Sequence, residues 1–131
     1  MLTRLPRADE DANSPSEPFD PALLKAVVGG DLMIARELIE DFGPSARADA
    51  AVIHRAAAEA LMEEVRAASH KLKGSAALIG ARDLIALCMQ LQLAAAGGEP
   101  SQVAALAAQL DMRLQEVEAA LETFLERTSW R

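Results

Sequence analysis

The sequence contains no tyrosine and a single cysteine, and aromatic residues make up only 3% of it. One cysteine, Cys88, excludes a disulfide within the chain. Residues 1–18 lack the apolar run of a secretory signal peptide, so we expect a reducing, cytoplasmic compartment. No segment approaches the roughly 18 consecutive apolar residues that a membrane-spanning helix needs. We therefore expect no direct contact with a membrane.

Basic residues are also in the minority. The chain has 13 Lys and Arg residues against 20 Asp and Glu residues, and its net charge is −7. A surface that binds nucleic acid is normally basic, so we expect no nucleic-acid partner. Apolar residues make up 51% of the chain, with alanine and leucine the most frequent. Because both residues favour helix over sheet, the composition predicts an all-α fold.

The pattern along the chain divides it into a tail and one domain. Residues 1–18 combine three prolines with polar and acidic residues, which predicts a disordered tail or linker, and residues 19–131 form the domain. Helical spacing and stop signals predict a short helix followed by four long ones. Short connections place consecutive helices side by side, which predicts an antiparallel four-helix bundle with a short additional N-terminal helix at one end. The expected segments are 21–28, 32–53, 61–79, 82–96 and 101–127.

Gly43 and Pro44 interrupt the second expected helix. Proline in a helix interior removes a backbone hydrogen bond and costs about 3 kcal/mol. We therefore expect a kink or a break at this point.

His70 lies in the third expected helix, on the face opposite the core. At about 100° per residue, the apolar residues of this helix gather in one arc around Leu72. His70 and Gly74 fall on the other side, with Lys73 at its flank, so the imidazole is expected to face solvent. The residues of the core arc are Leu61, Val65, Ala68, Leu72, Ala76 and Ile79.

The neighbours of His70 suit a phosphoryl acceptor. Glycine in an exposed helical turn costs about 1 kcal/mol relative to alanine, so Gly74 needs a reason other than stability. Helical side chains tilt toward the N-terminus, so a glycine at this position leaves the imidazole of His70 uncovered. Lys73 places a positive charge within reach of a group attached to His70. Neutral imidazole is a nucleophile at neutral pH and could take a phosphoryl group from an acyl phosphate.

The segment His70-Lys71-Leu72-Lys73-Gly74-Ser75 resembles the H-x-L-K-G-[SA] signature of histidine-containing phosphotransfer (HPt) domains. The layout from about residue 19 to residue 127 is also similar to that family. The resemblance implies that His70 accepts the phosphoryl group, Lys73 steadies it and Gly74 gives access. It further implies that Gln92, on the next helix, forms a hydrogen bond near the histidine.

The resemblance implies a phosphocarrier, rather than an autonomous kinase, that shuttles a phosphoryl group between receiver-domain aspartates through His70. The expected partners are response-regulator receiver domains, with a hybrid sensor histidine kinase as a further candidate. The sequence shows no carboxylate cluster for magnesium and no glycine-rich phosphate loop. We therefore expect no cofactor in this chain and Mg²⁺ on the partner receiver. A monomer is expected.

Small residues surround His70 on its helix, with charged residues at their edge. This pattern predicts a partner-binding surface formed by Glu63, Arg66, Ala67, Lys71 and Ala77, with apolar contacts from residues 32–42 of the second helix. An alternative function is a helical adaptor that uses the same face to hold a receiver or another partner without accepting phosphate. Such an adaptor has no need of an exposed histidine flanked by lysine and glycine.

The remaining candidates favour ordinary structural roles. His54 lacks a lysine three residues later and a glycine four residues later, so we interpret it as a surface histidine. The two histidines have no cysteine partner at ligand spacing, which predicts no metal site. Cys88 falls among leucines and is expected to be a core thiol. The methionines expected to fill gaps in the core are Met33, Met62, Met89 and Met112.

Overall fold

The computed structural model describes residues 18–129, and within this range the chain is helical without a strand. The all-α prediction is confirmed. The expected tail falls almost entirely on residues 1–17, which lie outside the described residues, so that part of the domain division stays a prediction. The helices are α2 (Pro21–Val27), α3 (Leu32–Ala58), α4 (Met62–Ile79), α5 (Arg82–Ala96), α6 (Pro100–Ala107) and α7 (Leu110–Arg127).

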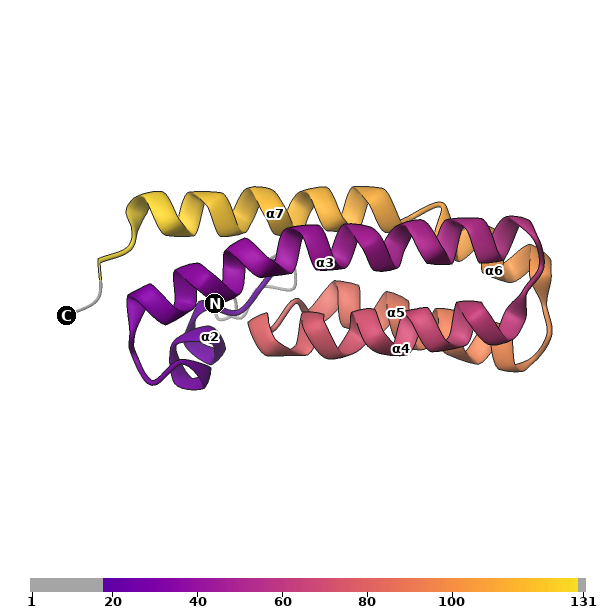
Figure 1. Cartoon of the computed structure of the whole chain (residues 1–131), viewed down its shortest axis with the longest axis horizontal. Helices are drawn as coiled ribbons and strands as arrows, with labels where there is room; N and C mark the ends of the chain where they lie inside the picture. Colours follow the sequence, from indigo (N-terminus) through magenta and orange to yellow (C-terminus); the bar gives the residue numbers. More distant parts are fainter. Residues whose placement is uncertain (1–17, 130–131) are drawn as a thin grey trace, which may run out of the picture.

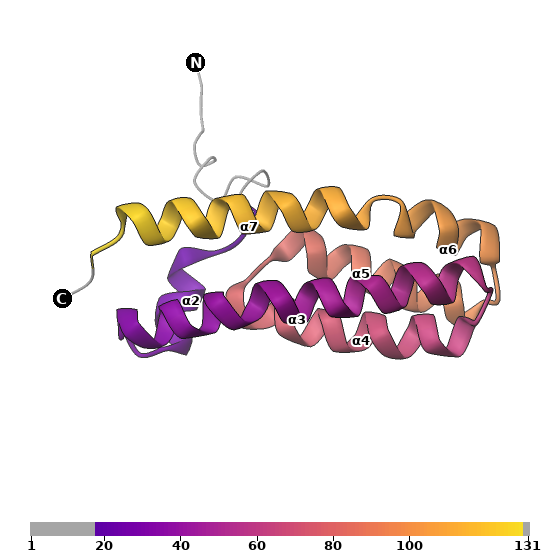
Figure 2. The same cartoon turned by 45° about the horizontal axis from the view of Figure 1, so that its top comes forward.

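The long helices form an antiparallel four-helix bundle, with α6 and α7 together as its fourth member (Figures 1 and 2). Helix α4 packs between α3 and α5, and α7 packs on α3 and α5 at the far side of the bundle. One continuous apolar core fills the interior, and each long helix contributes to it. Its largest fully buried side chains include Ile53, Leu72, Leu84, Leu91 and Leu110.

Helix α2 covers the end of the bundle at which α4 ends (Figure 1). Its N-cap is Asp20, whose carboxylate accepts hydrogen bonds from the N–H groups of Ala22 and Leu23, as expected of an aspartate before proline. The N–H of Asp20 donates to the carbonyl of Ile79 over 3.4 Å, which joins the two segments.

The turn from α4 to α5 requires glycine for two reasons. Gly80 has a φ of +68°, in the left-handed region that residues with a side chain rarely adopt. A Cβ at this position would also lie 2.8 Å from the Cβ of Asp20. The glycine therefore ends α4 and allows the N-terminal segment to pack against this corner.

Of the kink or break expected at Gly43-Pro44, the break does not occur, because α3 continues through both residues. Pro44 is exposed and directs its ring to solvent, while residues on either side of it are buried in the same core. Phe42 precedes it and Ala46 follows it at helical spacing. The burial of apolar side chains on both sides offsets the missing hydrogen bond and keeps the helix in one piece.

The single long helix predicted over 101–127 is also wrong, because it is divided into α6 and α7. The N–H of Gln109 donates to the carbonyl of Leu106, three residues back, so the chain makes a tighter turn between the two helices. Neither glycine nor proline marks this point. The apolar spacing from Val103 through Leu110 continues across the turn, so periodicity alone does not reveal it.

Leu61 was expected in the core face of the third helix, but it is 37% exposed and precedes α4 as its N-cap. The chain leaves α3 through Ala60, whose φ of +57° is unusual for a residue other than glycine. This turn carries Leu61 out of the bundle. The buried residue that the wheel missed is Ser69, with no exposed surface.

Candidate functional site

His70 projects from the outer face of α4 and is exposed, as the helical wheel predicted. Its neighbours Ser69 and Leu72 are fully buried, and they fix the rotation of α4 about its own axis. The bundle core therefore determines the direction in which the imidazole points. Because His70 takes no part in core packing, it is available to another molecule.

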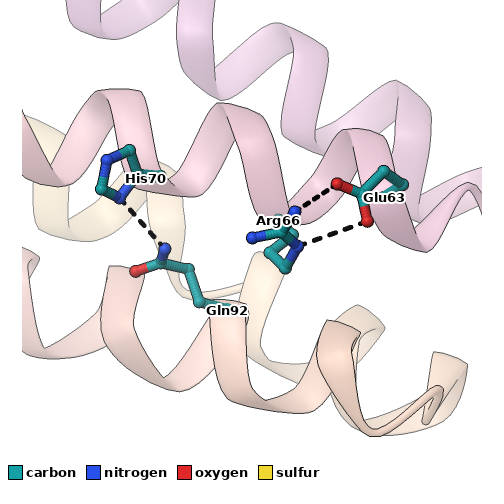
Figure 3. A network of polar contacts seen from close by, with 4 residues as sticks. All are labelled: Glu63, Arg66, His70 and Gln92. Carbon is teal, nitrogen blue, oxygen red and sulfur yellow. Dashed lines mark hydrogen bonds and ion pairs between the residues drawn. The ribbon is translucent and has the colours of Figure 1, made fainter.

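Gln92 reaches His70 from the neighbouring helix α5. Its side-chain nitrogen Nε2 lies 3.3 Å from Nδ1 of the imidazole, and Figure 3 shows the amide pointing across from α5 to the ring. Gln92 is half-buried, so the packing of α5 on α4 limits its motion. The hydrogen bond expected for Gln92 is present. It occupies Nδ1, which leaves Nε2 as the ring nitrogen open to a partner.

Lys73 lies on the side of α4 that faces α5, the same side on which Gln92 contacts His70. It is half-buried, and its charge acts on the thiol of Cys88 on α5. Burial raises the pKa of Cys88 to about 12, and the positive charge of Lys73 opposes that shift. Cys88 is fully buried and is the core thiol that the sequence predicted.

Gly74 leaves open space beside the imidazole. It is exposed, and a Cβ added at this position would meet no atom within 4 Å apart from its chain neighbours and the backbone of its own helix. Packing therefore does not require glycine here. The absence of a side chain at the fourth position after His70 leaves this side of the ring uncovered.

Lys71 does not share the environment of Lys73. Its ammonium nitrogen lies 3.4 Å from Oδ1 of Asp49 on α3, so it faces the opposite seam of α4. Asp49 is buried, and its other carboxylate oxygen, Oδ2, has no hydrogen-bond partner. Lys71 is thus the neutralising partner of a buried charge. The sequence placed Lys71 at the edge of the docking surface and did not reveal this ion pair.

Arg66 and Glu63 form an ion pair one turn before His70. Nη2 of Arg66 donates to Oε2 of Glu63, and Nε donates to Oε1 over 3.3 Å. The hydrogen bond from Arg66 lowers the pKa of Glu63, and the same bond raises the pKa of Arg66. Both side chains are exposed, and Figure 3 shows the pair on α4, along the helix from His70.

Ala67 and Ala77 are exposed, as their proposed place on a docking surface requires. On α5, the apolar side chains of Met89 and Leu93, three residues before and one residue after Gln92, are 49% and 73% exposed. The prediction that Met89 fills a gap in the core is therefore wrong. The spacing of Leu84, Leu87 and Leu91 would have shown that Met89 and Leu93 lie on the other face.

The methionine prediction is wrong for two further residues, since Met33 and Met112 are 75% and 61% exposed, while Met62 is half-buried.

On the other side of α4, the segment 32–42 does border the helix. A cleft of about 140 Å³ lies there between α3 and α4. Its apolar lining includes Leu38 and Phe42 of α3 and Leu78 of α4.

The second histidine lies apart from this site. Nε2 of His54, on α3, is 3.2 Å from Oδ1 of Asp111 on α7, which makes it part of a surface ion pair. Among residues 18–129, no group of three or more His, Cys, Asp and Glu side chains is arranged to hold a metal ion. Within the same range, no helix has the length and apolar character needed to cross a bilayer.

Comparison with known proteins agrees with this geometry. The family model of the Hpt domain matches residues 37–123, which is more than half of the chain and contains both His70 and Gln92. This chain belongs to the Hpt domain family. Its function is histidine phosphotransfer in two-component phosphorelays, in which Hpt domains act with receiver domains and histidine kinases.

A solved structure gives the same fold for the Hpt domain described here. The crystal structure of histidine-containing phosphotransfer protein B from Pseudomonas aeruginosa PAO1 superposes with a TM-score of 0.78 at 20% sequence identity. The match covers 86% of this chain and 97% of that one. No curated protein sequence matches the chain significantly.

Proposed function

We propose that this Hpt domain carries its phosphoryl group on Nε2 of His70. The observation that supports this most is the contact between Gln92 and Nδ1, at 3.3 Å, on an imidazole that is otherwise exposed. One ring nitrogen faces α5, and the other faces away from it. A partner that approaches from solvent therefore meets Nε2 first.

Gln92 can also select the reactive form of the ring. In neutral imidazole one nitrogen carries a proton and the other carries the lone pair that attacks phosphorus. In the structure the amide nitrogen faces Nδ1, and when it donates to Nδ1 the proton resides on Nε2, so that nitrogen cannot attack. When the amide turns by half a rotation, its oxygen accepts a hydrogen bond from Nδ1–H and leaves the lone pair on Nε2. Gln92 is thus a positioning residue for His70.

The transfer step forms a bond between Nε2 and phosphorus as the bond between phosphorus and the aspartyl oxygen of the donor breaks. The electron pair of the broken bond leaves with the aspartate carboxylate, and the proton on Nδ1 is released to water. The product is a phosphoramidate on His70. The reverse sequence delivers the phosphoryl group to a second receiver.

Lys73 and Gly74 support this step in different ways. The ammonium group of Lys73 partly neutralises the two negative charges that a phosphoryl group brings to His70. Gly74 leaves room for the receiver to bring its aspartate close to the ring. Transfer of this kind depends mainly on position and charge, which a preformed helical surface can supply.

The partners that we propose are response-regulator receiver domains, with a hybrid sensor histidine kinase as a further source of phosphoryl groups. Receivers would supply the Mg²⁺ that phosphoryl transfer requires, because the described part of this chain gathers no ligands for it. The chain would act as a monomer in the cytoplasm. Its docking surface would comprise the exposed residues Glu63, Arg66, Ala67, Lys71 and Ala77 together with Met89 and Leu93.

The competing function, an adaptor that binds receivers without accepting phosphate, predicts a different result in one experiment. Candidate receivers are phosphorylated with labelled acetyl phosphate and Mg²⁺, freed of the donor and mixed with wild-type protein or with His70→Gln. We expect label to move to the wild type alone, while both proteins bind the receiver equally. Binding without transfer to the wild type would support the adaptor and reject the proposed role of His70.

A further inference from the structure

We propose that Arg66 supplies a second positive charge to the phosphoryl group on His70. Until that group forms, Arg66 is paired with Glu63. This inference rests on the proposed role of His70. It changes the role of Arg66 from a contact at the edge of the docking surface to a group that binds the phosphoryl oxygens.

The position of Arg66 supports the proposal first. Residues four apart on a helix differ by about 40° in direction and lie one above the other. Because helical side chains tilt toward the N-terminus, the ring of His70 leans over the turn that carries Arg66. Lys73, three residues after His70, leans back toward the ring from the other side. A phosphoryl group on Nε2 would therefore lie between the two cations.

The hydrogen bonds of Arg66 support the proposal next. Two guanidinium nitrogens, Nε and Nη2, are engaged by Glu63. The third, Nη1, is not part of this pair and points along α4 toward His70 and Gln92 (Figure 3). A guanidinium group binds phosphate oxygens through paired N–H donors. Arg66 is thus partly oriented toward the site before any phosphoryl group is present.

The ion pair between Arg66 and Glu63 would open because it is weak and because a phosphoryl group carries more charge than a carboxylate. An exposed ion pair is weak in water, and Arg66 and Glu63 are 48% and 77% exposed. A phosphoryl group carries up to two negative charges, against one on the carboxylate, and offers three oxygens as acceptors. Once it forms, it competes for the guanidinium.

The test uses phosphoramidate, which phosphorylates histidine directly and avoids any effect of receiver docking. Nε2 forms a bond to phosphorus, the bond from phosphorus to the amine breaks, and ammonia leaves with a proton. The measured quantity is the fraction of phosphorylated protein at equilibrium with fixed phosphoramidate and ammonia, determined by ³¹P NMR. We expect the equilibrium constant to fall about fivefold in Arg66→Ala and to rise about twofold in Glu63→Gln.

A double variant separates direct binding from simple neutralisation of Glu63. If Arg66 contacts the phosphoryl group, adding Arg66→Ala to Glu63→Gln still lowers the equilibrium constant severalfold. If Arg66 only neutralises Glu63, the double variant matches Glu63→Gln, and the proposal is wrong. Arg113 and Glu116 on α7 form a matched ion pair, with the same three-residue spacing, outside the His70 site. Arg113→Ala and Glu116→Gln should leave the equilibrium unchanged.

The same experiment distinguishes failure of this inference from failure of the proposed function. If the wild type gains no phosphoryl group at His70, the proposed function fails. If it gains one, but Arg66→Ala retains the wild-type equilibrium constant and loses only transfer from receivers, Arg66 is a docking residue. That second result would overturn the inference and leave the role of His70 intact.

Discussion

The ammonium group of Lys71 lies 3.4 Å from a carboxylate oxygen of Asp49, a residue that is only 4% exposed. This pair joins α4 to α3 on the side of the helix away from Gln92. It divides the two lysines of the His70 segment between two tasks. Lys71 neutralises a charge within the bundle, and Lys73 remains beside His70.

Substitution of the two lysines should therefore affect different properties, the stability of the fold for Lys71 and the lifetime of the phosphohistidine for Lys73. Lys71→Ala leaves the buried carboxylate of Asp49 without its ionic partner, and we expect a loss of stability on the order of 1 kcal/mol. Lys73→Ala should leave the free energy of unfolding nearly unchanged and shorten the lifetime of the phosphohistidine. Urea denaturation and the decay of labelled protein measure the two effects. Equal losses of stability in both variants would contradict this division.

Gln92 offers a test that does not depend on stability. Gln92→Glu places at Nδ1 a group that can only accept a hydrogen bond, so the Nδ1–H form of His70 should predominate. Gln92→Leu removes the hydrogen bond and should allow both neutral forms. The ¹⁵N chemical shifts of the imidazole report which nitrogen is protonated. Identical ring shifts in wild type, Gln92→Glu and Gln92→Leu would show that Gln92 does not orient the ring.

Two substitutions of Gly74 should have different effects, a gain of stability for alanine and a loss of transfer activity for glutamine. Gly74→Ala meets no neighbouring atom and should stabilise the protein by up to about 1 kcal/mol, because alanine loses less backbone entropy in a helix. Gly74→Gln should slow phosphoryl transfer at least tenfold, because its side chain would lie over the imidazole. Thermal unfolding and single-turnover transfer measure these changes. Transfer by Gly74→Gln at the wild-type rate would refute the access argument.

The docking surface can be tested at two exposed alanines. Ala67→Arg and Ala77→Arg should keep the wild-type melting temperature, because both positions face solvent in the free domain. We expect transfer from receivers to fall more than tenfold in each, while phosphorylation by phosphoramidate continues. Normal transfer in both variants would mean that receivers dock elsewhere.

The solvent-facing direction of His70 could be predicted from the sequence, because it depends only on the rotation of one regular helix about its axis. The sequence was also sufficient for the ends of α5, which glycines mark on both sides. It failed at Pro44, because the burial of side chains on both sides of the proline outweighs a local cost. It failed at Gln109 for the opposite reason, since a turn without glycine or proline leaves no local signal.

Contacts between helices were harder to anticipate than the helices themselves. The ion pair of Lys71 with Asp49 depends on the register of α3 against α4, which neither segment specifies alone. The contact of Gln92 with His70 has the same character, and it was expected only because of the family resemblance. The exposure of Met89, in contrast, could have been predicted, because the spacing of the leucines in α5 places Met89 on the opposite face.

The central claim is that one nitrogen of one histidine carries the phosphoryl group. The most direct measurement treats wild-type protein, His70→Gln and the matched variant His54→Gln with phosphoramidate and locates the product by ¹H–³¹P correlation NMR. We expect one phosphohistidine, bonded at Nε2, in the wild type and in His54→Gln, and none in His70→Gln. Undiminished phosphorylation of His70→Gln, or a product on Nδ1, would contradict the account.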